Sequence, residues 1–191
     1  MTLYHTILAD PPWQERGGGT IRRGADRHYP LMSTEDICRL GYPLRQFLAD
    51  DCHLHLWVTN NFLPDGLRVV QAWGFRYVTT RTWAKDRMGL GQYARGQTEH
   101  ILFAVRGKTM METGATVTTL IGGKVLRRWQ HSVKPVETYR EVEAMSPGPY
   151  LELFARERRA GWHAWGNEID SDIQLLPPDP TQLALWGGGG E

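Results

Sequence analysis

The sequence predicts an α/β protein with one folded domain over residues 1–173 and a flexible tail over residues 174–191. Apolar segments of strand length alternate with segments of helical periodicity, which is the pattern of an α/β sheet. With 191 residues and 41% hydrophobic content, the chain is long enough for one well-buried core and short for two. From Gln174 onward the composition changes to Leu, Pro, Asp and a terminal glycine run without periodicity, which predicts the tail.

The first predicted strand covers residues 4–9, which are mostly apolar and end abruptly at an Asp-Pro-Pro turn. A capping-box pattern of Ser33 and Asp36 then opens a helix that we expect to break near Gly41. Residues 53–59 alternate and are rich in Leu, Trp and Val, so they predict a second core strand.

The rest of the chain continues the alternation of helices and strands. We expect a helix over 61–73, strands over 75–83 and 100–105, a hairpin or irregular segment over 117–126, a helix over 135–145, and strands over 150–154 and 161–165. A Gly-rich, basic stretch separates the strands over 75–83 and 100–105. Open sheets of this class place their ligands at the carboxyl ends of the strands.

Composition excludes several classes of protein. Cys38 and Cys52 lie far apart and lack metal-ligand spacing, which argues against a disulfide scaffold and a metal site and fits a reducing compartment. No stretch approaches the ~20 apolar residues of a membrane span. The sequence therefore predicts a cytoplasmic protein without a membrane partner.

Positive charge is concentrated locally, because the net charge of the whole chain is only +1. Any contact with nucleic acid must therefore be local. One glycine-containing loop carries Arg16, Arg22, Arg23 and Arg27, which we expect to contact a nucleic-acid substrate. Taken alone, the same arginines also fit ordinary solvated surface charge.

Asp10-Pro11-Pro12-Trp13 combines a carboxylate, a carbonyl in a turn stiffened by two prolines, and an indole at a strand end. The Asp10 carboxylate and the Pro11 carbonyl can hold both hydrogens of an exocyclic amino group such as that of adenine. A fixed carboxylate also stabilises the positive charge that this nitrogen gains as it attacks a methyl group. Trp13 offers a face for base stacking. The tetrapeptide equally fits an ordinary turn and an anchored core side chain; its place between a strand and a long Gly/Arg loop favours chemistry.

Several motifs, in this order, resemble the N6-adenine methyltransferases typified by the catalytic subunit of the eukaryotic messenger-RNA adenosine methyltransferase. The motifs run from about Ile7 to Ile169 and are Ala9-Asp10-Pro11-Pro12-Trp13, Tyr29-Pro30-Leu31-Met32-Ser33, Leu56-Trp57-Val58-Thr59, Glu99-His100, His131-Ser132-Val133-Lys134-Pro135, Leu151-Glu152-Leu153-Phe154 and Gly166-Asn167. The resemblance implies a Rossmann-like S-adenosylmethionine-dependent fold with a circularly permuted motif order. The implied reaction is methyl transfer to the N6 amino group of adenine, with DNA favoured as the polymer. RNA is the alternative substrate. A third possible function is that of a catalytically silent subunit that binds nucleic acid.

The resemblance also implies roles for individual residues. The residues expected at the cofactor are Asp10, Thr98, His131, Lys134, Glu152, Phe154, Arg156, Arg158, Arg159, Asn167 and Glu168. Tyr29 is expected at the active-site mouth and Trp57 at the substrate. On the residues alone, Asn167 and Glu168 equally fit a turn after a strand, and Tyr29 a core side chain. Two departures from the family pattern are Ala155, where glycine is usual, and Thr98, where a lysine stands in the messenger-RNA enzyme.

Gln182-Leu183-Ala184-Leu185-Trp186 in the tail resembles the short motif by which bacterial DNA enzymes dock on the replicative sliding clamp. Alternating apolar anchors on a Pro-rich tether suit insertion into a hydrophobic groove. An apolar tail that folds back on its own domain, or a chance pentapeptide, fits the sequence as well. A domain this small is also expected to form a homodimer if it must hold a duplex. The target sequence and the preferred strandedness are not readable from the residues.

Overall fold

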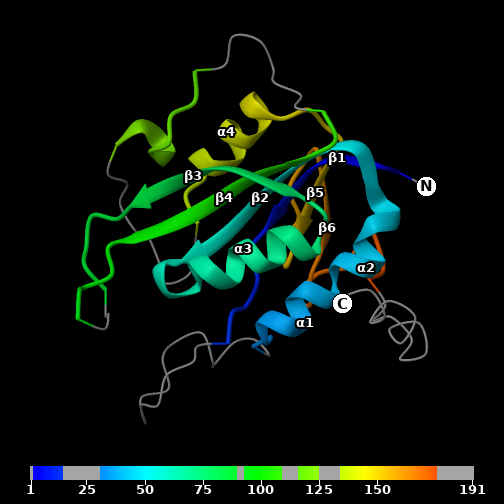
Figure 1. The fold of residues 1–191 in the computed structure, drawn as a ribbon. Coiled ribbons are helices and arrows are strands. Elements are labelled where there is room, and N and C mark those ends of the chain that lie inside the picture. Colours follow the sequence, from blue (N-terminus) through cyan, green and yellow to red (C-terminus); the bar gives the residue numbers. More distant parts are fainter. Residues whose placement is uncertain (1, 15–30, 90–92, 109–115, 125–133, 176–191) are drawn as a thin grey trace.

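The computed structural model describes residues 2–14, 31–89, 93–108, 116–124 and 134–175, and its core is a six-stranded sheet with the order β3-β4-β2-β1-β5-β6 (Figure 1). The strands are β1 (Tyr4–Ala9), β2 (Leu48–Thr59), β3 (Arg76–Ala84), β4 (Thr98–Arg106), β5 (Tyr150–Leu153) and β6 (Trp162–Trp165). β1 pairs in parallel with β2 and β5, and β5 with β6. β4 runs antiparallel to both of its neighbours, β2 and β3.

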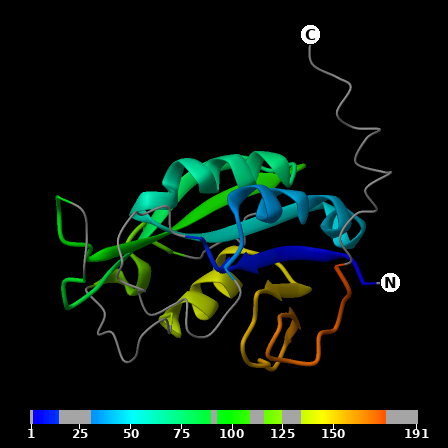
Figure 2. The same ribbon diagram turned by 90° about the horizontal axis from the view of Figure 1, so that it is seen from below.

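Helices cover both faces of the sheet. The α-helices are α1 (Thr34–Arg39), α2 (Gly41–Leu44), α3 (Leu63–Ala72) and α4 (Glu137–Met145), and the short 3-10 turns are η2 (Arg45–Phe47), η3 (Asn60–Phe62) and η4 (Ile121–Gly123). Figure 2 shows α1, α2 and α3 on one face and α4 on the other. The α/β architecture expected from the sequence is therefore present, as a sheet between two helical layers.

The side chains of β2 point alternately to the two faces of the sheet and contribute to a separate core on each face. Leu54, Leu56 and Val58 join the larger buried cluster, whereas Trp57 joins a second cluster that includes Val142 of α4. Successive side chains of a strand point to opposite faces, so one strand can serve both cores. Trp57 therefore lies on the α4 side of the sheet.

Most local predictions are confirmed at the level of elements. β1 has the predicted bounds, and Ser33 caps α1 by accepting a hydrogen bond from the backbone of Asp36. The helix breaks after Leu40, as expected near Gly41. β2 begins at Leu48, five residues before the predicted start. Residues 117–126 are predicted as a hairpin or an irregular segment, and their described part is irregular: it forms the η4 turn and an isolated bridge between Leu120 and Thr82.

The folded core extends slightly past the predicted domain boundary. Ile173 and Leu175 are 7% and 6% exposed and belong to the larger buried cluster. The predicted tail begins at Gln174, so the expectation that nothing from residue 174 onward contributes to the core is wrong at Leu175. Residues 176–191, which hold the remainder of the predicted tail, lie outside the described residues.

One edge of the sheet collects strand ends from both halves of the chain. The parallel strands β1, β2, β5 and β6 all reach their carboxyl ends there, and the antiparallel β4 begins there, since Thr59 pairs with Glu99. Side chains that follow β1 or β5 in sequence therefore meet side chains that open β4. This is the edge at which α/β sheets bind ligands.

Candidate active site

Asp10 is the first residue after β1 and lies near the centre of this edge. Its backbone N–H donates to the carbonyl of Leu153 on β5, at 3.4 Å, which fixes the start of the loop. Its carboxylate Oδ2 lies 2.6 Å from the Nζ of Lys134, and the Asp10 side chain remains 33% exposed. The predicted catalytic carboxylate is thus both anchored and accessible.

Lys134 precedes α4 and joins two carboxylates. Its Nζ lies 3.4 Å from Oε2 of Glu99 as well as contacting Asp10, and it sits 5.1 Å from the ring centroid of Trp57. Burial by itself would lower the pKa of Lys134, but the charges of Asp10 and Glu99 outweigh burial and raise the pKa above its usual value. Lys134 is therefore held as an ammonium at the centre of the cluster.

Glu99, the second residue of β4, completes a chain of alternating charge. Lys85, just beyond the end of β3, forms a salt bridge with it, and the Nζ of Lys85 lies 4.9 Å from the ring centroid of Trp83. Burial would raise the pKa of Glu99, yet the charges of Lys134 and Lys85 outweigh it and lower the pKa. Glu99 is consequently ionised, and Asp10, Lys134, Glu99 and Lys85 form a balanced network.

Sequence reasoning did not select Glu99 or Lys85 as site residues. Glu99 opens a strand, and residues that open a strand lie at the ligand edge only when the strand runs antiparallel to the others. The hydrophobic pattern of β4 does not encode that direction. The motif Glu99-His100 carried the only available signal.

Trp13 is a correction to the predicted stacking platform. Its side chain is 8% exposed, its indole Nε1 donates to the carbonyl of Trp57 at 3.1 Å, and its ring stacks on Phe62 with centroids 5.3 Å apart. Of the two interpretations left open by the sequence, the structure supports the anchored core side chain. Trp13 anchors the loop that follows Asp10, and a base cannot stack on its ring without unpacking the core.

The prolines of the motif are held by backbone hydrogen bonds. The N–H of Trp13 donates to the carbonyl of Pro11 at 2.9 Å, and the N–H of Met32 donates to the carbonyl of Pro12 at 2.8 Å. Trp13 and Met32 also form an isolated parallel bridge. The turn after Asp10 is therefore pinned on both sides, which restricts the direction in which the carboxylate and the Pro11 carbonyl point.

Trp57 is a second correction, because it was expected to contact substrate. It is 2% exposed and packs edge-on against Trp83, with ring centroids 6.3 Å apart. The charged Nζ of Lys134 lies over its ring. The structure gives Trp57 an indirect role as the support beneath Lys134.

Glu152 lies beside Asp10 on the neighbouring strand, since Glu152 pairs with Leu8 of β1. The hydroxyl of Tyr139 on α4 donates to its Oε1 at 2.8 Å, and the guanidinium of Arg159 lies 3.7 Å from the Tyr139 ring centroid. Burial raises the pKa of Glu152, and the charge of Asp10 adds to this, while Tyr139 and Arg159 oppose it. A second half-buried carboxylate thus stands at the predicted cofactor position.

The segment after β5, which is expected to contact the cofactor, packs closely against the end of β6. Phe154 has a left-handed backbone with φ of 65° and packs edge-on against Trp165, with centroids 5.4 Å apart. Ala155 is buried, and an added Cβ on Gly166 would lie 2.0 Å from its carbonyl oxygen, so Gly166 is required for the close approach of these two strand ends. Arg156 is exposed next to this turn.

Arg158 pairs with the segment after β6, and its expected contact with the cofactor stays a prediction. Its Nη2 lies 2.6 Å from Oδ1 of Asp172, and its Nη1 donates to the carbonyl of Asp170. Arg158 therefore holds the segment after β6 and is not part of the network around Asp10. Asn167 and Glu168, just after β6, are exposed.

Thr98 lies at the same edge but bonds outside the charged network. The amide Nδ2 of Asn60 donates to the carbonyl and the hydroxyl of Thr98, at 3.3 and 3.1 Å. The ring of His100 lies 2.7 Å from Oδ1 of Asn60 through Nε2 and 3.0 Å from the Thr82 hydroxyl through Nδ1. Because the Asn60 oxygen only accepts, Nε2 of His100 carries the proton.

Several predicted site residues lie outside the described residues. They are Arg16, Arg22, Arg23, Arg27, Tyr29 and His131. Their roles stay predictions. Within the described ranges no group of three or more His, Cys, Asp or Glu side chains is arranged to hold a metal ion, and no helix there is long and apolar enough to cross a membrane.

Comparison with known proteins gives one family and a consistent set of relatives. A profile of the MT-A70 family matches residues 4–168. The chain is 32% identical over 200 residues to the type II methyltransferase M.MunI of Mycoplasma sp, covering 94% of this chain and 82% of that protein. It is 30% identical over 187 residues to the human N(6)-adenosine-methyltransferase catalytic subunit METTL3, covering 92% of this chain but only 30% of that protein. Human METTL4, an N(6)-adenine-specific methyltransferase, is 27% identical over 186 residues, which cover 87% of this chain and 37% of that protein.

Proposed function

The chain belongs to the MT-A70 family and is an N6-adenine methyltransferase, and from this premise we propose that it methylates adenine in DNA with Asp10 as the catalytic carboxylate. DNA is favoured because the relative that matches over most of both chains is a type II methyltransferase, a class of DNA enzyme. The adenosine methyltransferases match over a much smaller share of their own length. RNA adenosine is the second candidate substrate, because these relatives are nearly as similar over the matched region.

The observation that carries the proposal is the position of the Asp10 carboxylate at the open end of β1. Adenine's amino nitrogen shares its lone pair with the ring and is a poor nucleophile. Acceptors that grip its two hydrogens favour a more tetrahedral nitrogen. Among the described residues, Lys134 bonds Oδ2 of Asp10 and Trp13 bonds the Pro11 carbonyl once, so Asp10 Oδ1 and the second lone pair of that carbonyl can serve as these acceptors. As the nitrogen gains positive charge, the fixed carboxylate stabilises the transition state more than the ground state.

S-adenosylmethionine is the methyl donor we propose, and the described residues fit it. The donor carries a cationic sulfonium, an ammonium, a carboxylate and a ribose, and when bound it would supply an electrophilic methyl group. The carboxylates of Asp10 and Glu152 lie on adjacent strand ends and suit its positive groups and its ribose hydroxyls. Lys134 is a retained ammonium that can pair with its carboxylate. This chain's own network supplies both signs of charge that the donor requires.

We also propose a circularly permuted order of the motifs, and a catalytically active rather than a silent subunit. The catalytic loop follows β1, whereas the Glu152 segment follows β5 late in the chain, which supports a circularly permuted order. A protein that only bound nucleic acid would have no use for an accessible carboxylate held at 2.6 Å by a half-buried ammonium.

The test is transfer of a labelled methyl group from S-adenosylmethionine to DNA duplexes, DNA single strands and RNA oligonucleotides. We expect transfer to DNA, and we expect Asp10→Asn to lower the single-turnover rate by about 100- to 1000-fold, as for loss of one preorganised electrostatic contact. Calorimetric titration of the donor separates loss of chemistry from loss of binding. Mapping of methylated adenines in the DNA of an expressing host then gives the sequence context.

Each of the other possible results would point to a different function or to a different catalytic residue. Transfer to RNA alone would establish the RNA activity. Donor binding without transfer to either polymer would establish the silent subunit. An Asp10→Asn variant with full turnover would remove Asp10 from the chemistry.

A further inference from the structure

The hairpin between β3 and β4 continues beyond the sheet and is braced by hydrogen bonds. Its described residues are 85–89 and 93–97. The N–H of Lys85 donates to the Gln97 carbonyl and the Gln97 side-chain amide donates to the Lys85 carbonyl, both at 2.9 Å. Further out, the N–H of Gly89 donates to the Gly96 carbonyl at 2.6 Å and Nε of Arg95 to the Gly89 carbonyl at 2.7 Å. These hydrogen bonds therefore hold the two described arms of the hairpin together beyond the end of the sheet.

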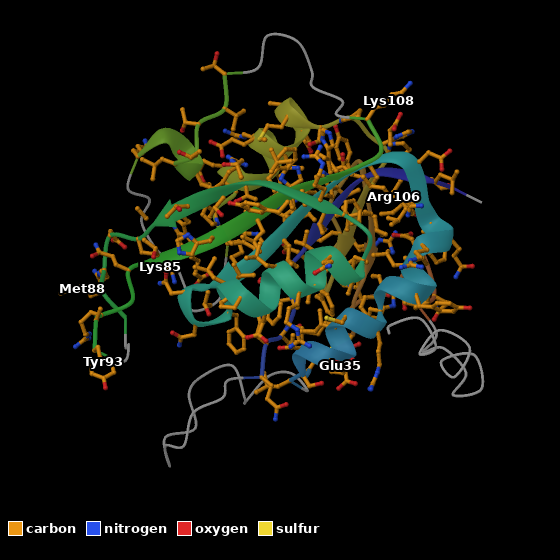
Figure 3. The ribbon with its side chains drawn as sticks, viewed as in Figure 1. Glu35, Lys85, Met88, Tyr93, Arg106 and Lys108 are labelled. Carbon is orange, nitrogen blue, oxygen red and sulfur yellow. The ribbon has the colours of Figure 1, made fainter. Side chains whose placement is uncertain are left out.

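The base of this hairpin is part of the active site. Lys85 is its first residue and forms the salt bridge with Glu99, which is linked through Lys134 to Asp10. Figure 3 shows Met88 and Tyr93 on the segment that extends past Lys85, away from the helices. The hairpin therefore begins at the charged network around Asp10 and extends outward from it.

The outer part of the hairpin carries side chains that contribute nothing to the described core. Tyr93 is fully exposed, at 113%, and Met88 is 64% exposed. Tyr93 also has a φ of 60°, a left-handed conformation that is uncommon for residues other than glycine and that clusters at functional sites. Arg87 and Arg95 are exposed beside them. An exposed aromatic ring flanked by cations is the arrangement that binds unpaired nucleic-acid strands.

We propose that this hairpin grips the DNA strand next to the target adenine, with Tyr93 stacking on a base and Arg87 and Arg95 facing phosphates. The inference rests on the proposed function, because it assigns a surface to the same substrate. The charge of the hairpin favours DNA as its ligand: residues 85–97 hold three cationic side chains and one acidic side chain, Asp86, which suits a polyanion. The ring adds a sequence-tolerant contact to a base, whereas the arginines contact only the phosphates.

The test measures the Kd of a fluorescently labelled, adenine-containing DNA, as duplex and as single strand, by anisotropy at several salt concentrations. We expect Tyr93→Ala to weaken binding by about 5- to 100-fold, which corresponds to loss of one base stack, and Tyr93→Phe to stay within about twofold of the wild type. Arg87→Gln should reduce the slope of log K against log salt by about 1. Tyr77→Ala is the matched control, because Tyr77 is an exposed tyrosine, 41% accessible, at the opposite end of β3.

The outcomes separate this proposal from the proposed function. If the wild-type protein methylates DNA but Tyr93→Ala binds it as tightly as Tyr77→Ala does, the hairpin proposal is wrong and the function stands. If binding depends on Tyr93 but no methyl transfer occurs, the hairpin proposal stands and the function is wrong. A wild-type protein that does not bind DNA overturns the hairpin proposal, and the same titration with RNA then identifies the polymer.

Discussion

Lys134 is the residue on which the charge balance of the active site depends. It neutralises Asp10 and Glu99 at once and rests on the ring of Trp57. Without it, the two carboxylates would face each other across a half-buried site, which disfavours ionisation of at least one of them. The network therefore balances the charges around Asp10 and holds Lys134 as an ammonium, which is the form that the proposed pairing with the donor's carboxylate requires.

Replacing Lys134 with methionine should chiefly impair donor binding. We expect Lys134→Met to raise the KM for S-adenosylmethionine by about 10- to 100-fold, because a charge-assisted hydrogen bond is lost. The measurement is steady-state methyl transfer at varied donor concentration. Lys108→Met is the control, since Lys108 is exposed and lies outside the site. Equal KM values for the two variants would show that Lys134 does not contact the donor.

Trp13 should behave as a core residue in a stability experiment. Trp13→Ala removes a buried ring that stacks on Phe62, and we expect a loss of about 3–5 kcal/mol in the free energy of unfolding. Trp13→Phe keeps the stacking but loses the indole bond to Trp57, so its cost should be smaller, about 1 kcal/mol for the hydrogen bond. Urea denaturation measures both. Weaker DNA binding without any loss of stability in Trp13→Ala would instead restore the stacking role.

At the scale of elements, β2 and α4 enclose a polar cluster that the catalytic network does not use. The hydroxyl of Ser146, at the end of α4, lies 2.8 Å from Nδ1 of His53 and 2.9 Å from Nε2 of His55. The other nitrogen of each imidazole is buried without a hydrogen-bond partner in the described part of the structure. Nearby, Arg81 is 1% exposed and paired with Glu141. Both imidazoles are therefore held neutral beside a buried cation.

This cluster predicts a stability that falls on mild acidification. Burial lowers the pKa of His53 below 6.5, and burial together with the charges of Arg81 and His53 lowers the pKa of His55 further. The unfolded chain thus binds protons at a pH where the folded chain does not, so stability is complete above about pH 6.5 and is lost as the pH falls below it. We expect a lower urea midpoint at pH 5.5 than at pH 7.5. In His55→Phe the difference should shrink, and equal midpoints for the wild type would contradict the prediction.

The elements that the sequence predicted well are those with local signals. β1 ends at an Asp-Pro-Pro turn and α1 begins at a capping serine, and both are specified by neighbouring residues. The direction of β4 depends on partners far along the chain, which is why Glu99 was missed. The burial of Trp13 was undecided for the same reason, because an indole after a turn fits a core or a binding face until Phe62 is placed beside it.

At the scale of the whole molecule, buried side chains tie the last described residues to the core. Ile173 and Leu175 pack in the larger core cluster, so truncation after residue 175 should leave the unfolding midpoint unchanged. Truncation after residue 172 removes both side chains, and we expect it to cost about 3–6 kcal/mol at about 1.5–3 kcal/mol for each buried side chain. Urea denaturation of the two truncated proteins measures this difference, and equal midpoints would exclude a contribution of Leu175 to the core.

The longer truncated protein also tests what the removed segment does. It lacks Gln182-Leu183-Ala184-Leu185-Trp186, whose proposed partner is the sliding clamp, while it retains Asp10 and the charged network. If that segment is a docking peptide, the truncated protein should methylate short oligonucleotides at the wild-type rate and lose association with purified clamp in a pull-down. Leu185→Ala together with Trp186→Ala in the full chain should reproduce the loss, because the apolar anchors carry such contacts. Sedimentation of the same proteins would show whether a homodimer forms when residues 176–191 are removed. Clamp association that survives both changes, or that is absent from the wild type, would show that the segment is not a docking peptide.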